Sequence, residues 1–314
     1  DSFCIELVRD HFQLLGVQPD FKIADPSSLA PLEERAMTAV LDSHYAADDA
    51  DFRLLLETLG ADYGDGPLVD AVRKVYDSSR CMPFPEDWLQ QAADMYRPGE
   101  KLSDTPWAEI LLARAGREAA AMGSALSQAL REIENVEKIG EAYGPALADG
   151  KEQLEKVQAA AGRRDWDGVY NALQAFAFPA FKPLRQFPDA GLKQRVTAVR
   201  DRVQKQTQRL AGRFFAPAAE QEALLERAGA CMRKLAELVR EYGEEKRRLM
   251  ERRGTLSFDD VEHLALQLLV KKEEGCLKPT PAAAEICRRY DQVLVDEYQD
   301  RSEERRVGKE CRSR

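Results

Sequence analysis

Two adjacent carboxylates stand directly after a short apolar run near the end of the sequence. In YDQVLVDEYQD, residues 290–300, Asp296 and Glu297 follow an apolar stretch at residues 292–295 that predicts a β-strand. Ligands of α/β sheets bind beyond the carboxyl ends of the strands, so this strand would present both carboxylates to a phosphate group. Nucleotide hydrolysis needs one carboxylate that holds Mg²⁺, usually through water, and a second that orients or deprotonates the attacking water. Asp296 suits the first role and Glu297 the second; a strand that merely ends in an acidic turn is the alternative.

The elements that must position these carboxylates are nearly all helical. Apolar residues recur from Leu224 to Tyr242 at steps of four and three, the spacing of helices packed nearly parallel. Ser257 and Asp260 form a start that resembles a capping box. The predicted helices cover residues 2–15, 31–45, 51–59, 68–79, 88–96, 106–147, 150–161, 165–176, 192–213, 218–252 and 257–270, with Gly16 as a C-terminal cap of the first. The predicted fold class is therefore mainly α with one strand, whose sheet must be completed by residues outside this sequence because a lone strand is not stable.

Composition narrows the class of protein. The 314 residues are 44% apolar and 32% charged, which allows a sizeable core and is typical of long solvent-facing helices. No apolar run is long enough to cross a membrane and no signal peptide opens the sequence, so we expect a cytoplasmic protein. The six cysteines form no CxxC pair and the three histidines are scattered, which indicates neither a zinc site nor a disulfide framework. The net charge of -9 argues against a protein that simply coats nucleic acid.

Both ends of the sequence suggest a piece of a longer protein. The chain opens on DSFCIELV without an initiator Met. Residues 301–314, RSEERRVGKECRSR, show no helical or strand period and resemble the translated read-through of a sequencing adapter. We predict that they are a non-native tail; a genuine basic tail is the alternative.

One stretch of the chain is strongly basic, although the chain as a whole has a net negative charge. Residues 193–213 hold seven basic side chains against the single acid Asp201. Such a face would contact DNA phosphates without regard to base sequence, while the alternative is an ordinary solvated helix face. The candidate DNA-binding residues are Lys193, Arg195, Arg200, Arg202, Lys205 and Arg209. Trp88, Trp107 and Trp166 could stack on bases, but we interpret them as core anchors.

Several segments resemble one family in the same order along the chain. DEYQD at residues 296–300 resembles motif II (Walker B), usually DExQD, of the UvrD-like superfamily 1 helicases. Ser2-Phe3-Cys4 resembles the end of the family's TxHSFC segment, and GTLSFDDVEHLALQLL from Gly254 resembles its [LD]xFxDL helix. HFQLLGVQPDFKIAD from His11 and WDGVYNALQAFAFP at residues 166–179 are similar to the AddA or RexA family of helicase–nucleases. The resemblance covers residues 1–300, and Asp1 departs from the His of many superfamily members.

This resemblance implies a helical insertion, 1B, within the first of two RecA-like P-loop NTPase domains. Residues 1–24 and 254–300 would belong to that first domain, 1A, and residues 25–253 to 1B. The implied cofactors are ATP and Mg²⁺, with Asp296 on Mg²⁺ through water, Glu297 and Gln299 catalytic, and Asp300 in the same ATP-site motif. The implied function is that of a 3′–5′ DNA helicase/nuclease subunit in double-strand break repair. It would act on duplex ends or single strands together with an AddB- or RexB-type second subunit.

The phosphate-cradling loop GxxxxGK[ST] does not occur in the 314 residues. Asp296 and Glu297 would therefore be half of an active site, and we expect this polypeptide alone to hydrolyse no ATP. Two other interpretations stay open: a plain UvrD- or RecB-type helicase without a nuclease, and a helical scaffold or interaction protein in which DEYQD is accidental.

Overall fold

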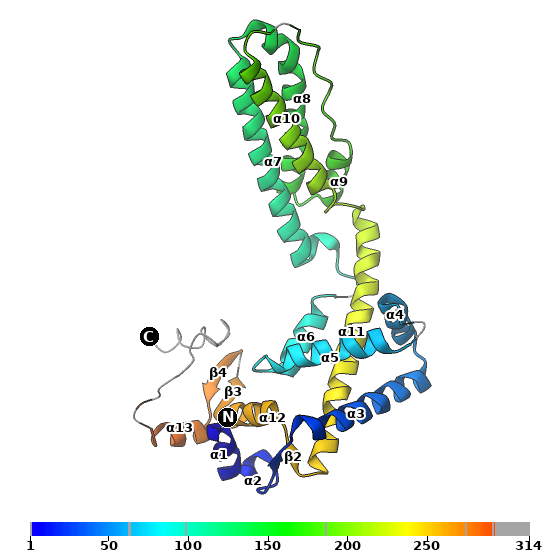
Figure 1. Cartoon of the computed structure of the whole chain (residues 1–314), viewed down its shortest axis with the longest axis vertical. Helices are drawn as coiled ribbons and strands as arrows, with labels where there is room; N and C mark the ends of the chain where they lie inside the picture. The colour runs from blue at the N-terminus through cyan, green and yellow to red at the C-terminus, as the bar shows by residue number, and fades with distance from the viewer. Residues whose placement is uncertain are drawn as a thin grey trace. The chain divides into compact units, whose positions relative to one another are not determined.

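The computed structural model describes residues 2–61, 64–97, 99–185, 187–273, 275–290 and 292. Within these residues the chain is mainly helical, as predicted, and Figure 1 labels most of its helices and strands. The chain divides into two compact units, each described by itself below. Unit 1 draws on residues 1–49, 61–89 and 237–314, and unit 2 on residues 50–60 and 90–236.

Ten elements lie wholly in unit 1: α1 (Ser2–Asp10), α2 (Phe12–Leu15), β1 (Lys22–Ile23), α3 (Pro26–Ala47), α5 (Gly66–Arg80), β2 (Thr255–Leu256), α12 (Phe258–Leu269), β3 (Val270–Glu273), β4 (Cys276–Pro279) and α13 (Pro281–Cys287). Unit 2 contains α4 (Ala50–Leu59), the 3-10 helix η1 (Leu102–Asp104), α7 (Pro106–Ile133), α8 (Glu137–Gly162), α9 (Trp166–Gln174) and α10 (Ala190–Ala211). Two helices contribute to both units: α6 (Pro85–Asp94) and α11 (Ala218–Glu251).

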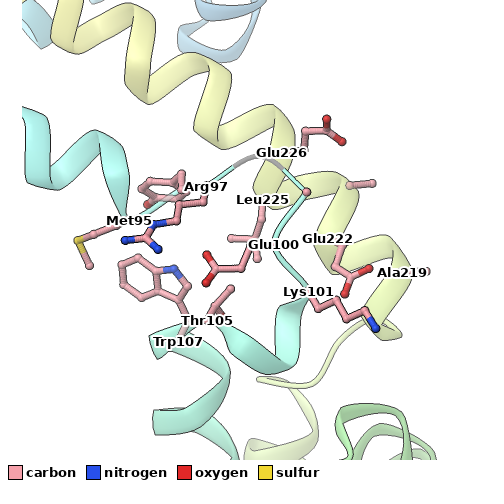
Figure 2. Close-up of a pocket in the computed structure, with 13 residues that line it drawn as sticks. Met95, Arg97, Glu100, Lys101, Thr105, Trp107, Ala219, Glu222, Leu225 and Glu226 are labelled. Atoms are coloured by element: carbon pink, nitrogen blue, oxygen red, sulfur yellow. The ribbon is translucent and has the colours of Figure 1, made fainter.

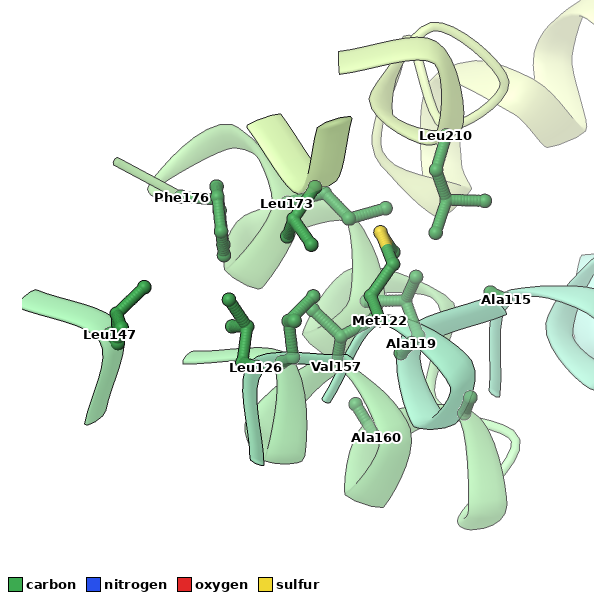
Figure 3. Packing of buried hydrophobic residues seen from close by; sticks show 14 of the residues in the cluster. Ala115, Ala119, Met122, Leu126, Leu147, Val157, Ala160, Leu173, Phe176 and Leu210 are labelled. Carbon is green, nitrogen blue, oxygen red and sulfur yellow. The ribbon is translucent and has the colours of Figure 1, made fainter. Parts of the chain in front are cut away.

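Helices α7 to α10 build the core of unit 2. The buried residues of α7 recur from Ala108 to Ile133 at alternating steps of four and three, which keeps one side of the helix against its neighbours. Met122 of α7, Val157 of α8, Leu173 of α9 and Leu210 of α10 belong to one buried cluster (Figure 3). Burying each large apolar side chain contributes about 1.5–3 kcal/mol, so this cluster is the main source of stability in unit 2.

The single helix predicted over residues 106–147 is wrong. α7 ends at Ile133, and α8 starts at Glu137 and continues through the break predicted at residues 148–149. Gly150 lies inside α8, and its role is in packing: a Cβ there would lie 2.1 Å from the ring of Phe178. The break was predicted just before Gly150, a position where a distant aromatic ring leaves room only for glycine.

A small core in unit 1 joins the beginning of the chain to residues 254–290. α1 packs against α12, and their shared cluster contains Val8, Phe21, Leu256, Val261 and Ala265. Two helix ends in this region are confirmed. Gly16 caps α2 with φ of 67°, the left-handed conformation that glycine adopts without strain. Ser257 and Asp260 form the capping box of α12.

Sequence reasoning also missed four short strands and a second helix break, at His11. β1 pairs with β2 in parallel, and β3 pairs with β4 antiparallel. Strands of two to four residues are too short to show a period of two, which is why the sequence did not predict them. The helix predicted over residues 2–15 is interrupted at His11, and Val270 begins β3 instead of ending α12. Of the strand predicted at residues 292–295, only Gln292 is described, and it lies in no strand.

No helix among the described residues combines the length and the hydropathy that crossing a membrane requires.

Candidate nucleic-acid interface

The predicted ATP-site motif, Asp296, Glu297, Gln299 and Asp300, lies outside the described residues. The structure describes the chain that leads to this motif as far as Tyr290, and it describes all six candidate DNA-binding residues.

Helix α13 is the last element before the motif. Ile286 of α13 clusters with Leu7 of α1 and Leu268 of α12. Beyond the helix, the ring of Tyr290 lies edge-on to the ring of Phe3, with their centroids 5.9 Å apart. Phe3 belongs to the SFC segment and Tyr290 opens the run that contains DEYQD. The structure therefore brings together the beginnings of two segments that carry the family resemblance.

Helix α10 places the six candidate DNA-binding residues on different sides. The side that packs into the core carries Leu192, Val196, Val203 and Leu210. At about 100° per residue, four of the cations project away from this side, and all four are exposed. They are Arg195, Arg202, Lys205 and Arg209. Lys193 and Arg200 lie beside the buried stripe and are half-buried.

Lys193 and Arg200 are engaged with the protein itself. Lys193 Nζ donates a hydrogen bond to the Leu184 carbonyl oxygen at 3.2 Å. The Arg200 guanidinium lies 5.7 Å from the ring centroid of Phe178 and 5.1 Å from that of Phe181. A cation held over two aromatic faces contributes about 0.5–2 kcal/mol per contact, so Arg200 holds the loop after α9 against α10. Neither residue presents its charge freely to a ligand.

Three of the outward cations remain available. Arg195 Nε lies 3.5 Å from Glu132 Oε2, an exposed pair. Arg202, Lys205 and Arg209 have no ion-pair partner among the residues that the structure describes. They recur at steps of three and four and therefore lie within about 10 Å along the helix axis. This row of Arg202, Lys205 and Arg209, the outward row, is the part of the basic stretch that can meet phosphates.

Of the three tryptophans, Trp166 is buried, whereas Trp88 and Trp107 are half-buried. Trp166 is a core anchor, since it is 5% exposed and its Nε1 donates to the Ala216 carbonyl oxygen at 3.0 Å. Trp107 is half-buried and lines a pocket of about 310 Å³, with its ring centroid 5.7 Å from that of Tyr96 (Figure 2). The charged lining consists of Arg97, Glu100, Lys101, Glu222 and Glu226. Three acids against two bases do not favour a phosphate group here.

The chain matches the family model described as the UvrD/REP helicase N-terminal domain over residues 1–305. Curated relatives, each named as the A-type subunit of an ATP-dependent helicase/nuclease, are similar along its length. The one from Pelotomaculum thermopropionicum is 33% identical over 95% of this chain and 24% of its own length. The one from Moorella thermoacetica is 32% identical over 95% of this chain and 22% of its own length. The one from Acetivibrio thermocellus is 29% identical over 95% of this chain and 24% of its own length.

The chain thus spans about a quarter of the length of the curated relatives it matches. The family match takes in every segment that resembles the helicases, from Ser2-Phe3-Cys4 to DEYQD at residues 296–300. By this match, the chain belongs to the UvrD/REP helicase N-terminal domain family.

Proposed function

We propose that this chain is the segment of an ATP-dependent DNA helicase/nuclease subunit that contains motif II and a helical DNA-gripping insertion. The observation that carries the proposal is the family match over residues 1–305, which includes DEYQD. The relatives named as helicase/nuclease subunits of the A type support the nuclease-linked member of the family. The whole enzyme would unwind DNA in the 3′–5′ direction during double-strand break repair in the bacterial cytoplasm. A second subunit of the AddB or RexB type would be its partner.

The pairing of β1 with β2 supports the proposed domain boundaries. Lys22 N donates to the Gly254 carbonyl oxygen at 2.9 Å, and Ala24 N donates to the Leu256 carbonyl oxygen at 2.9 Å. The residues just before position 25 thus lie beside those just after position 253. A chain that leaves a domain and returns to it must close in this way. Residues 25–253 would then be the 1B insertion, and residues 1–24 and 254–300 parts of the 1A domain.

The donor chemistry of motif II fits ATP with Mg²⁺. Oxygen ligands are what Mg²⁺ prefers, and Asp296 would hold it through water. Glu297 would orient the attacking water or accept its proton, with Gln299 and Asp300 in the same motif. Bound Mg²⁺ would supply charge neutralisation at the phosphates.

ATP turnover tests this assignment. The 314-residue chain carries no GxxxxGK[ST] loop, so it should show no DNA-stimulated ATP hydrolysis. A longer chain that includes such a loop and both RecA-like domains should hydrolyse ATP, and Glu297→Gln should lower its kcat by about a hundredfold or more. Turnover by the short chain, or full turnover in the Glu297→Gln enzyme, contradicts the assignment.

DNA binding by the outward row is tested by charge removal. The triple variant Arg202→Ala, Lys205→Ala, Arg209→Ala should weaken duplex binding, and the slope of log Kd against log salt should flatten by about 3. A matched control removes three cations that are already paired with acids, Lys151, Lys156 and Arg163. Fluorescence anisotropy over a salt series measures both. Equal effects in the two variants would mean that net charge alone decides affinity and that the outward row is not the contact.

A further inference from the structure

His44 of α3 lies against Glu241 of α11 inside unit 1. Its Nε2 is 2.7 Å from Glu241 Oε2. His44 is 6% exposed, whereas the side chain of Glu241 is 40% exposed. The imidazole is therefore fixed in the protein, and the carboxylate reaches it from the solvent side.

Glu237 brings a second carboxylate to the same place. It precedes Glu241 by four residues on α11, so the two side chains lie on one face of the helix. One ligand atom from each of His44, Glu237 and Glu241 lies within 4.8 Å of the other two. Within the described part of the chain, this is the one such group of three histidine, cysteine or acidic residues. The sequence did not indicate this group, because His44 lies almost two hundred residues from the two acids.

The spacing is close to that of a metal site. With metal–ligand distances of about 2.0–2.2 Å, two ligand atoms of a tetrahedral ion lie about 3.3 Å apart. The His44–Glu241 contact would have to lengthen by about half an ångström, and Glu237 would have to move inward. Both glutamates are only half-buried, so rotation of their side chains can supply these shifts. Glu241 also lines an open cavity of about 410 Å³ with Ser43 and Glu244, so this ligand is accessible from solvent.

We propose that His44, Glu237 and Glu241 bind a divalent first-row transition ion of the Zn²⁺ type, with water in the remaining position. The ion binds Nε2 of the neutral imidazole of His44, any proton on that nitrogen passes to solvent, and the ion links α3 to α11. An imidazole with two carboxylates is a donor set that Zn²⁺ accepts, whereas Mg²⁺ takes oxygen ligands. The proposal is independent of the proposed helicase function.

Titration of the tag-free chain with Co²⁺ and Zn²⁺ tests the site. One equivalent of Co²⁺ should give visible d–d bands without a thiolate charge-transfer band, and Zn²⁺ should displace it. Mg²⁺ at the same concentration should not. A chain that shows no saturable binding of one equivalent overturns the proposal, and so does a thiolate band, which would place the ion on the cysteines. Binding of Zn²⁺ should also raise the Tm of the chain, because a ligand of the folded state stabilises it.

Variants of the two glutamates locate the ion. His44→Ala removes a buried side chain and could unfold unit 1, so Glu237→Gln and Glu241→Gln carry the test. Each should raise the Kd for Co²⁺ by about tenfold or more, because even changes to groups that only hydrogen-bond to a metal ligand weaken binding 10- to 100-fold. Glu244→Gln is the matched control, since Glu244 lines the cavity but is not in the cluster. It should change the Kd less than about twofold. Equal weakening by all three would indicate diffuse attraction to an acidic surface and would overturn the proposal.

Discussion

Arg80 at the end of α5 forms an ion pair with Asp260 in the first turn of α12: Arg80 Nη2 lies 2.8 Å from Asp260 Oδ1. Their side chains are 18% and 19% exposed, so solvent screens the pair only partly. The same carboxylate accepts hydrogen bonds from Ser257 N at 3.0 Å and Ser257 Oγ at 2.6 Å. Asp260 therefore completes the cap at the start of α12 and ties this helix to α5 within unit 1.

Removing the Asp260 carboxylate should destabilise unit 1. Asp260→Ala deletes both the reciprocal cap and the partner of Arg80, and hydrogen bonds to charged groups contribute about 1.5–3 kcal/mol each. We expect the free energy of unfolding, measured by urea titration, to fall by about 3 kcal/mol. Asp259→Ala is the control, because this neighbouring acid is exposed and should change stability by about 0.5 kcal/mol or less. Similar losses in both variants would show that only the helix dipole matters.

Replacing each of two glycines of α8 by alanine should change the stability of the protein in opposite directions. At Gly150 an added Cβ would lie 2.1 Å from the Phe178 ring, so Gly150→Ala should cost about 1–3 kcal/mol of unfolding free energy. At Gly144 nothing lies within 4 Å of the added atom, and Gly144→Ala should stabilise the helix by up to about 1 kcal/mol. Thermal unfolding of the two variants measures the difference. If Gly150→Ala is also stabilising, the contact with Phe178 does not hold in solution.

Stability should depend on pH through Glu118 of α7. Partial burial of this carboxyl opposes its ionisation, but the hydrogen bond from Arg114 and the charge of Arg213 outweigh burial, so its pKa lies below the ordinary 4.5. Because the pKa of Glu118 is lower in the folded state, its ionised form adds stability that is fully present above pH 4.5. This stability is lost as the pH falls through the pKa of the folded state. Glu118→Gln should lower the Tm at neutral pH. The free energy of unfolding should fall by under about 1 kcal/mol, because solvent screens these partly exposed ion pairs. The Tm difference between the two proteins should disappear in acid, and a gap that persists there would rule out the ion pairs as its source.

Local signals in the sequence were sufficient to predict those features of the structure that depend on neighbouring residues. The capping box at Ser257 and Asp260, the glycine end at Gly16 and the long helix α11 followed from spacing alone, because a few consecutive residues determine them. The break between α7 and α8 could not be predicted from local spacing. These helices pack in one cluster with α9 and α10, which lie further along the chain.

The sequence by itself determined that the chain is mainly helical and which family it belongs to, because helical periodicity and a motif such as DEYQD are properties of adjacent residues. Only the tertiary structure decided which cations face outward and which histidine meets carboxylates. Arg200 and Arg202 are equivalent in the sequence, yet one lies over Phe178 and Phe181 while the other is exposed. His44 meets Glu241 only after folding. Such contacts depend on the packing of helices that are distant in sequence, and no local pattern encodes them.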